Sequence, residues 1–341
     1  MFSSFRVNTI SAAASAVVAN ETLVVADSLS PYLFVYNRSG DTFTKLTIST
    51  GLLSTNTQAH VAITASGSYV SIQDVTNRVY NYSRTGDTFT KLANLSPLPP
   101  GEVHGISWNP EGTSLALAHD SSPYMSIYNR SGVTFTKVAN PGTLPLGNGE
   151  GIAWNHDGTS IAIGGGNPTP GFVVYNRSGD TFTQIASFTN IGSIYDIAWN
   201  STGTSLAVVS DTSPYVNIYN RSGDTFTKVA NPATLPTSSS YGVSWNPSGT
   251  SLAVAHGSSP YVTIYNRSGD TFTKVANPAT LPGTNGQGVS WNYNGTSLVV
   301  RSGNTPFITI YNRSGDTFTK VANPATLPTG NARNAVFGIK P

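Results

Sequence analysis

The sequence predicts an all-β protein folded as a seven-bladed β-propeller, a ring of small antiparallel sheets. Three observations predict it. A phrase close to Tyr-Asn-Arg-Ser-Gly-Asp-Thr-Phe-Thr-Lys recurs seven times, beginning at residues 36, 82, 128, 175, 219, 265 and 311. Each repeat of about 46 residues holds four short segments with the patterns of strands, and no segment shows a helical period. Repeats of this length with four strands each are typical of propeller blades.

The four strands of one blade can be followed in the last complete repeat. We expect them at Gly288–Asn292, Ser297–Val300, Phe307–Tyr311 and Thr317–Ala322. The glycine of each Arg-Ser-Gly supplies the positive φ of a three-residue hairpin with a bulge between the third and fourth strands. Thr and Lys side chains on the fourth strand are typical of a protected sheet edge. We therefore expect the fourth strand on the outer rim.

Tryptophan marks the first strand of most blades, 20 or 21 residues before the repeat tyrosine: Trp108, Trp154, Trp199, Trp245 and Trp291. We expect these rings to pack between neighbouring blades, as core residues. The first two repeats lack this tryptophan. Counting 46 residues back from Trp108 gives Ala62 for the second blade, and counting back again gives Ala16.

The repeat that contains Trp245 carries a family resemblance. Trp245-Asn-Pro-Ser-Gly-Thr-Ser-Leu-Ala-Val-Ala, followed by Tyr261-Val-Thr-Ile-Tyr265-Asn, resembles a WD40-type blade. In that family a Pro-Asp-Gly turn joins the first two strands and a Trp-Asp pair ends the third. Tyr-Asn stands here in place of Trp-Asp, and the Gly-His dipeptide of the family is missing before the first strand. The chain also resembles, more weakly, propellers of bacteriophage virions and tails, because it is rich in Thr, Asn and Gly and has near-identical blades.

We expect residues 1–341 to form a single propeller domain, closed by its two ends. Leu327-Pro328 precedes Phe337 by the same offsets at which Leu281-Pro282 precedes Trp291. Residues 334–339 are therefore predicted to supply the inner strand of the first blade and to close the ring. The alternative is that Ala14 to Val18 form that strand and the C-terminus pairs elsewhere.

Composition excludes several classes of function. Charged residues make up 10% of the chain, and basic and acidic groups alternate within the repeated phrase, which is not the one-signed patch of a nucleic-acid-binding protein. The absence of cysteine excludes disulfides and thiol catalysis. No apolar run is long enough for a membrane helix, so no membrane insertion is expected. The N-terminus resembles a secretory signal only faintly, which leaves the localisation open, with a virion or an extracellular surface favoured.

Motifs for chemistry are lacking. The sequence contains no histidine pair with metal-ligand spacing and no strand-to-helix serine elbow, and no helix follows the glycine run at 164–166. Paired carboxylates can be recognised only from distances in space. We therefore expect no enzyme activity, no metal and no cofactor.

The repeats differ mainly in the loops on one face of the ring. The position four before each strand tryptophan, or its equivalent, is the most varied, with five residue types in seven blades: Gln58, His104, Glu150, Tyr195, Tyr241, Gln287 and Arg333. Tyr195, Asp196, Tyr241 and Arg301 flank the expected axial channel. Loops on a rigid scaffold are where binding residues collect. The seven residues at the varied position form a candidate binding ring. The alternative interpretation is that their variation is random change in loops that tolerate it.

Two functions are compatible with this pattern. The first is a non-catalytic structural or attachment module, possibly part of a phage virion or tail, held by protein partners in a larger assembly. The second is a lectin-like propeller that binds a surface glycan. Only the varied face distinguishes one blade from another, so the sequence places any specific site there.

Overall fold

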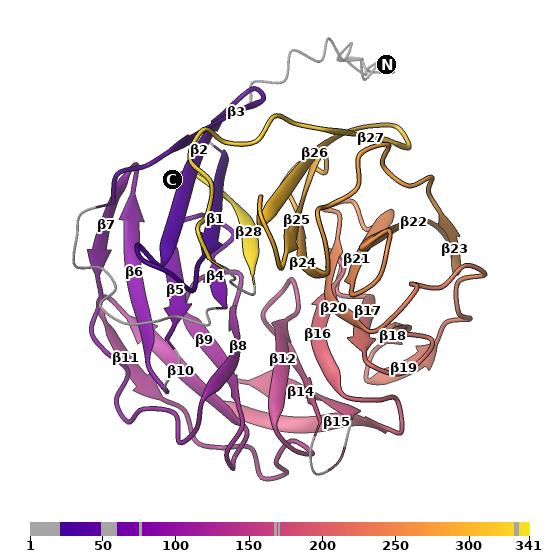
Figure 1. Cartoon of the computed structure of the whole chain (residues 1–341). Coiled ribbons are helices and arrows are strands. Elements are labelled where there is room, and N and C mark those ends of the chain that lie inside the picture. Colours follow the sequence, from indigo (N-terminus) through magenta and orange to yellow (C-terminus); the bar gives the residue numbers. More distant parts are fainter. Residues whose placement is uncertain (1–20, 49–59, 75–76, 167–168, 170, 331–333) are drawn as a thin grey trace, which may run out of the picture.

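The computed structural model describes residues 21–48, 60–74, 77–166, 169, 171–330 and 334–341. Within these ranges the chain forms 28 strands and no helix. The strands make seven antiparallel sheets of four strands each, arranged as a ring (Figure 1). The prediction of an all-β, seven-bladed propeller is confirmed.

The first four blades contain the following strands. Blade one has β28 (Ala335–Ile339), β1 (Glu21–Ala26), β2 (Leu33–Ser39) and β3 (Thr42–Lys45). Blade two has β4 (Val61–Ile63), β5 (Tyr69–Gln73), β6 (Val79–Thr85) and β7 (Thr88–Lys91). Blade three has β8 (Val103–Trp108), β9 (Ser114–His119), β10 (Met125–Ser131) and β11 (Thr134–Lys137). Blade four has β12 (Gly149–Trp154), β13 (Ser160–Gly165), β14 (Gly171–Ser178) and β15 (Thr181–Thr189).

The other three blades repeat the pattern. Blade five has β16 (Ile194–Trp199), β17 (Ser205–Ser210), β18 (Val216–Ser222) and β19 (Thr225–Lys228). Blade six has β20 (Ser240–Trp245), β21 (Ser251–His256), β22 (Val262–Ser268) and β23 (Thr271–Lys274). Blade seven has β24 (Gly286–Trp291), β25 (Ser297–Ser302), β26 (Ile308–Ser314) and β27 (Thr317–Lys320). In every blade the first strand named lies nearest the ring axis and the last lies at the rim (Figure 1).

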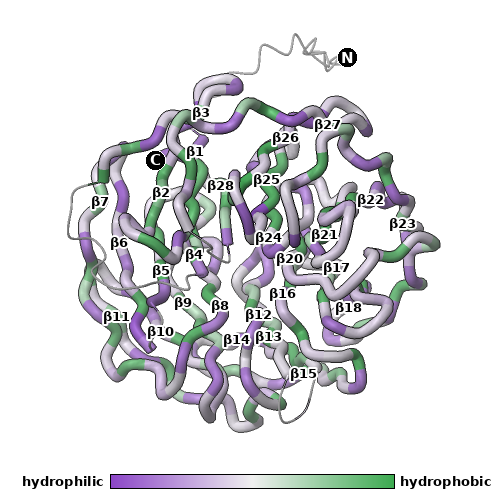
Figure 2. Tube along the Cα trace, in the orientation of Figure 1, coloured by the Kyte–Doolittle hydropathy of each residue, from purple (hydrophilic) through white to green (hydrophobic). Residues whose placement is uncertain are grey.

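The hydrophobic core lies between blades, because the two faces of each sheet pack on the sheets before and after it. One cluster joins Val209 and Val216 of blade five to Trp245 and Tyr265 of blade six. The tryptophans are buried as expected, and the indole of Trp245 donates to the carbonyl of Ala198 in the preceding blade at 3.2 Å. Figure 2 shows hydrophobic residues along the strands of the blades and many hydrophilic ones along the outer loops.

The ring closes through the two ends of the described chain, as predicted. β28 pairs with β1, and Phe337 lies opposite Leu23. Phe337 therefore holds in blade one the position that tryptophan holds in blades three to seven. The Asp27 carboxylate accepts the main-chain N–H groups of Thr329 and Gly330, at 2.7 and 3.1 Å, beside this pairing. The alternative inner strand, Ala14 to Val18, lies outside the described residues.

The repeated phrase fastens each blade to the next. In six of the seven junctions the asparagine of one phrase donates to the aspartate of the following phrase, as Asn220 does to Asp270 at 2.6 Å. The side-chain oxygen of the same asparagine accepts a hydrogen bond from the arginine of the following phrase, as Asn220 does from Arg267 at 3.1 Å. The charge pattern seen in the sequence is thus a set of contacts between blades.

Two details of the blades differ from expectation. The hairpin between the third and fourth strands has a two-residue loop, because Ser39 pairs directly with Thr42 around Gly40 and Asp41. In blade two, Ile63 pairs with Val70 in the way that Trp108 pairs with Leu115. Ile63, not Ala62, therefore occupies the tryptophan position, because the loop between the second and third strands is one residue shorter in that blade.

Candidate functional site

The innermost strands of five blades carry a β-bulge at the same place. The pairing register shifts between the residues on either side of one unpaired residue, and these unpaired residues are His104, Glu150, Tyr195, Tyr241 and Gln287. They are five of the seven residues of the candidate binding ring. A bulge leaves its extra residue outside the ladder and re-aims its side chain, and bulges are frequent beside active sites.

The inner strands approach one another closely one residue after the bulge. A Cβ atom on Gly242 would lie 2.7 Å from the Cα of Gly288 in the next blade, and one on Gly151 would lie 2.9 Å from the Cα of Asp196. Only glycine fits such a main-chain approach without a shift of the strands. The glycines therefore let the blades crowd together beneath the bulge residues.

A pocket of about 370 Å³ opens at this mouth of the ring. Four of its lining residues are the bulge residues of blades four to seven. The full lining is His60, Glu150, Tyr195, Tyr241, Asn285 and Gln287. The side-chain oxygens of Asn285 and Gln287 are buried and have no hydrogen-bond partner among the described residues. Buried polar atoms are normally paired, so this wall is suited to a polar ligand.

Two pairs of side chains organise the pocket. Nδ1 of His104 lies 3.9 Å from Oε2 of Glu150, which brings an imidazole beside a carboxylate at the pocket edge. The rings of Tyr195 and Tyr241 lie with their centroids 5.2 Å apart and form an aromatic wall. Burial is the largest of the effects that raise the pKa of Tyr195, followed by the charge of Asp211. The Tyr195 hydroxyl therefore stays protonated, and able to donate, at neutral pH.

Asp196 ties two inner strands together beside the pocket. One carboxylate oxygen accepts a hydrogen bond from the main-chain N–H of Ile197 at 2.9 Å. The other accepts one from the main-chain N–H of Val243, in the next blade, at 2.9 Å. Its position deep in the ring raises the pKa of this carboxyl to about 7, although the two N–H donors oppose the shift. Asp196 is a structural link whose charge changes near neutral pH.

The outcome for the sequence-derived residues is mixed. His104, Glu150, Tyr195, Tyr241 and Gln287 come together at one mouth of the ring, and their role in binding stays a prediction. Gln58 and Arg333 lie outside the described residues. In blade two, counting four residues back from Ile63 gives Ala59 in place of Gln58.

Arg301 does not offer its charge to the channel. It is fully buried, and its guanidinium donates to the main-chain carbonyls of Ser302, Phe307 and Gly330. Burial lowers the pKa of this group to about 10. Its expected place beside a binding face is therefore wrong, because the side chain is taken up by the joint between blades seven and one.

Sequence reasoning missed His60 and Asn285. Asn285 precedes the bulge by two residues, and the β-bulge that gives this segment its shape cannot be seen in the residue pattern. His60 stands three residues before Ile63, at the position that Gly105 holds in blade three. The shorter loop of blade two hid that equivalence.

Comparison with known proteins shows which molecules share this fold. No protein-family model matches the sequence, and no curated protein matches it. Among solved structures, a candidate 6-phosphogluconolactonase from Bacteroides fragilis is 14% identical, with a TM-score of 0.73 over 95% of this chain and 99% of that one. A second such candidate, from Bacteroides uniformis, is 12% identical, with a TM-score of 0.76 over 93% and 99%. The periplasmic gluconolactonase of Pseudomonas aeruginosa is 12% identical, with a TM-score of 0.72 over 95% and 100%.

These neighbours contradict the predicted function. The expectation of a non-catalytic structural, attachment or carbohydrate-binding module, with no enzyme activity, is wrong, because three neighbours that span the whole ring carry the names of lactone-hydrolysing enzymes. The pocket residues come from different blades and share no local motif, so the sequence contains no signal for them. At 12–14% identity the likeness itself establishes the common fold.

The remaining expectations have different outcomes. A chain of the mitotic checkpoint complex is 17% identical, with a TM-score of 0.65 over 89% of this chain and 87% of that one, and a WD40-like fold is consistent with this match. Similarity to phage virion or tail proteins is not shown. The expected protein partner stays a prediction. No helix long and apolar enough to cross a bilayer occurs in the part of the chain that the structure describes.

The chain is thus a seven-bladed β-propeller with the overall fold of these lactonases, and a polar, aromatic pocket opens at one mouth of its ring.

Proposed function

We propose that the protein is a hydrolase of small, hydroxylated lactones and that the ring-mouth pocket is its active site. The observation that carries this proposal is the meeting of a carboxylate, an imidazole and two tyrosine rings in one pocket, at Glu150, His60, Tyr195 and Tyr241. The names of the structural neighbours support the reaction class.

Lactone hydrolysis needs two proton transfers that these side chains can perform. Water adds its oxygen to the carbonyl carbon while a base takes a proton from it. The ring C–O bond then breaks, and an acid gives a proton to the departing oxygen, which yields an open-chain hydroxy acid. Glu150 is the base and His60 the acid in this assignment, since groups of this kind contribute by positioned proton transfer. The Tyr195 hydroxyl remains a donor and can stabilise the carbonyl oxygen as it gains negative charge.

The pocket favours a polyhydroxylated substrate. The buried oxygens of Asn285 and Gln287 can accept hydroxyl groups, and each amide also offers N–H donors. The Tyr195–Tyr241 wall can cover the C–H face of a sugar-derived ring. These groups would hold a lactone by its hydroxyls while its carbonyl faces Glu150.

The charges of the pocket favour a neutral lactone over a phosphorylated one. Neither lysine nor arginine occurs among the lining residues that the structure describes, and Glu150 contributes a negative charge. A phosphate group there would meet repulsion without a compensating cation. The substrate class is therefore closer to that named for the Pseudomonas aeruginosa neighbour than to that named for the Bacteroides proteins.

A comparison of two substrates tests this proposal. The rate of acid release from gluconolactone and from its 6-phosphate is followed with and without the protein. We expect clear acceleration over spontaneous hydrolysis for the neutral lactone and a weaker effect, or none, for the phosphate. If neither rate exceeds the spontaneous one, the proposed activity is wrong. If the phosphate is hydrolysed faster, the charge argument is wrong.

A further inference from the structure

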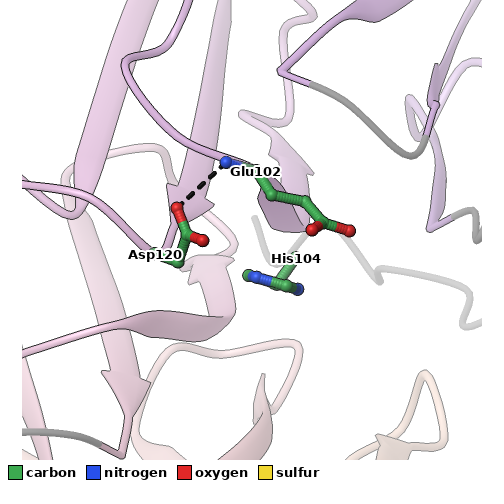
Figure 3. Close-up of side chains that lie close together, drawn as sticks. All are labelled: Glu102, His104 and Asp120. Atoms are coloured by element: carbon green, nitrogen blue, oxygen red, sulfur yellow. Dashed lines mark hydrogen bonds between the residues drawn. The ribbon is translucent and has the colours of Figure 1, made fainter.

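Three metal-ligating side chains converge at the edge of the ring mouth, in blade three. Figure 3 shows Glu102, His104 and Asp120, and one ligand-type atom from each lies within 4.8 Å of the others. Glu102 precedes β8, His104 is the bulge residue of β8, and Asp120 follows β9. All three are partly exposed, so an ion from solvent can reach them.

Main-chain contacts hold the two carboxylate residues in place. Oδ1 of Asp120 accepts the N–H of Glu102 at 3.0 Å, the dashed line of Figure 3, and the hydroxyl of Ser121 at 3.0 Å. The N–H of Asp120 in turn donates to the carbonyl of Glu102 at 3.1 Å. Hydrogen bonds that orient ligands in this way are a regular part of metal sites.

His104 has the surroundings of a ligating histidine. Its Nδ1 lies 3.9 Å from the Glu150 carboxylate, which comes from the next blade. A carboxylate behind the imidazole fixes the ring and raises its basicity as a ligand, and metal-bound histidines are regularly supported in this manner. One nitrogen of the His104 ring lies within 4.8 Å of a carboxylate oxygen of Glu102 and of one of Asp120.

The other blades show that the scaffold alone does not require these residues. Blade five has the same local structure, in which Asp211 Oδ1 accepts Ser193 N–H at 2.9 Å and the Thr212 hydroxyl at 3.0 Å. There, Ser193 and Tyr195 replace Glu102 and His104. The equivalent trios of blades four, six and seven are Asn148, Glu150 and Gly166; Ser239, Tyr241 and Gly257; and Asn285, Gln287 and Gly303. Of these five blades, only blade three combines three ligand residues.

We propose that Glu102, His104 and Asp120 bind one divalent transition-metal ion at the ring mouth. Zn²⁺ is bound in proteins by histidine nitrogen together with carboxylate oxygen, often by three protein ligands with water in the fourth position. Two carboxylates balance the charge of the ion. Since the site has one nitrogen and two oxygen donors, affinity should follow the general order, with Zn²⁺ above Mn²⁺ and Mg²⁺ below both. This proposal does not depend on lactone hydrolysis, although the ion would lie beside Glu150 of the proposed active site.

Calorimetric titration of chelator-treated, full-length protein with ZnCl₂, MnCl₂ and MgCl₂ tests the site. We expect one saturable Zn²⁺ site per chain, weaker Mn²⁺ binding, and an increase of the melting temperature with Zn²⁺. Asp120→Asn keeps the oxygen that accepts Glu102 N–H but removes the charged ligand, and it should weaken Zn²⁺ binding by about tenfold or more. Glu102→Gln should have a similar effect.

The matched control is Asp211→Asn, which makes the same change on the same scaffold in blade five. It should leave Zn²⁺ affinity unchanged. Absence of saturable binding by the wild-type protein, or an equal loss in Asp120→Asn and Asp211→Asn, would overturn the proposal. Zn²⁺ binding at this site without any lactone hydrolysis would leave the metal site standing and remove the proposed activity. Lactone hydrolysis without Zn²⁺ binding would support the proposed activity and overturn the metal site.

Discussion

The charge of Asp196 is linked to the stability of the ring. Its carboxyl has a pKa of about 7 in the folded ring, against an ordinary value of 3.8. A group that holds its proton more tightly when folded makes its full contribution to stability below its unfolded pKa. That contribution is lost as the pH rises from about 4 to about 7.

The prediction at this scale is a pH-dependent effect of Asp196→Asn. The free energy of unfolding of the variant minus that of the wild type should rise between pH 5 and pH 8, by on the order of 2 kcal/mol. The reason is that only the wild type has to ionise an acid whose folded-state pKa is raised. Denaturant unfolding at both pH values measures this difference.

Comparing Asp196→Asn with the wild type also cancels the opposite pH dependence that two buried histidines cause. Burial lowers the pKa of His119 and of His256 to about 4, so these groups make stability rise with pH as the unfolded chain releases its protons. Both proteins contain these histidines, and their contributions cancel. A difference that stays constant with pH would show that Asp196 does not have the raised pKa.

At single positions, the sequence reveals identity but not surroundings. Glu150, Tyr195 and Tyr241 could be selected because they vary where the repeat is otherwise constant. Arg301 varies too, yet its guanidinium donates to the main-chain carbonyls of Phe307 and, across a blade joint, Gly330. Variation alone cannot separate a side chain that faces a pocket from one that closes a gap, since that depends on contacts between distant segments.

Among the elements, the innermost strands combine a bulge with a close approach of main chains. The bulge turns residues such as Tyr241 toward the mouth, and the glycine that follows lets the next strand come near. A Cβ atom at Gly242 would lie 2.7 Å from the Cα of Gly288. The two features together place pocket residues on a tight ring of strands.

Gly242→Ala tests this packing. Because the obstacle is main chain, the strands have to move apart, and we expect a loss of about 1–3 kcal/mol of stability. Gly142→Ala is the matched control, since a Cβ atom there would meet nothing within 4 Å. Thermal or denaturant unfolding of both variants measures the effect. Equal stability of the two variants would contradict a close approach at Gly242.

Strands could be predicted well and their exact register less well. Alternating and β-branched segments located every strand of the last repeat to within three residues at each end, because strand pattern and turn residues are local signals. The bulges were not predicted, since glycine follows the unpaired residue in four of the five blades and hides the shift of the alternation. Ala62 was assigned to the tryptophan position of blade two in place of Ile63. The loop between the second and third strands is one residue shorter there, and counting by a fixed period cannot detect such a change.

On the scale of the whole molecule, the repeated phrase is a chain of contacts around the ring with one interruption. The junction between blades two and three has Ser83 in place of asparagine and Val133 in place of aspartate. Val133 is 60% exposed, and Arg130 of this junction lies over the ring of Tyr69, 3.8 Å from its centroid. Both partners of the usual hydrogen bond are therefore changed at the same junction.

Restoring that contact should stabilise the ring. The double variant Ser83→Asn, Val133→Asp should form the hydrogen bond seen between Asn220 and Asp270. We expect a favourable coupling of about 0.5–1.5 kcal/mol beyond the sum of the single variants. Unfolding of the wild type, both single variants and the double variant provides the cycle. Strictly additive effects would mean that the contact contributes nothing at this junction.

Closure of the ring could be predicted from the sequence because the C-terminal segment keeps the spacing of the repeat. The pocket could not be predicted, since His60, Glu150, Tyr241 and Asn285 are brought together from four blades by the circular arrangement alone. No window along the chain contains them, so no local motif marks the pocket.

The most direct test of the central claim, that the ring mouth is a hydrolytic site, is the steady-state hydrolysis of gluconolactone by Glu150→Gln. The substitution keeps the size of the side chain and removes the base, so kcat should fall by about a hundredfold or more while KM changes little. Glu111→Gln, outside the residues that line the pocket, is the matched control and should keep wild-type kcat. Wild-type kcat in Glu150→Gln, or an equal loss in Glu111→Gln, would contradict the account.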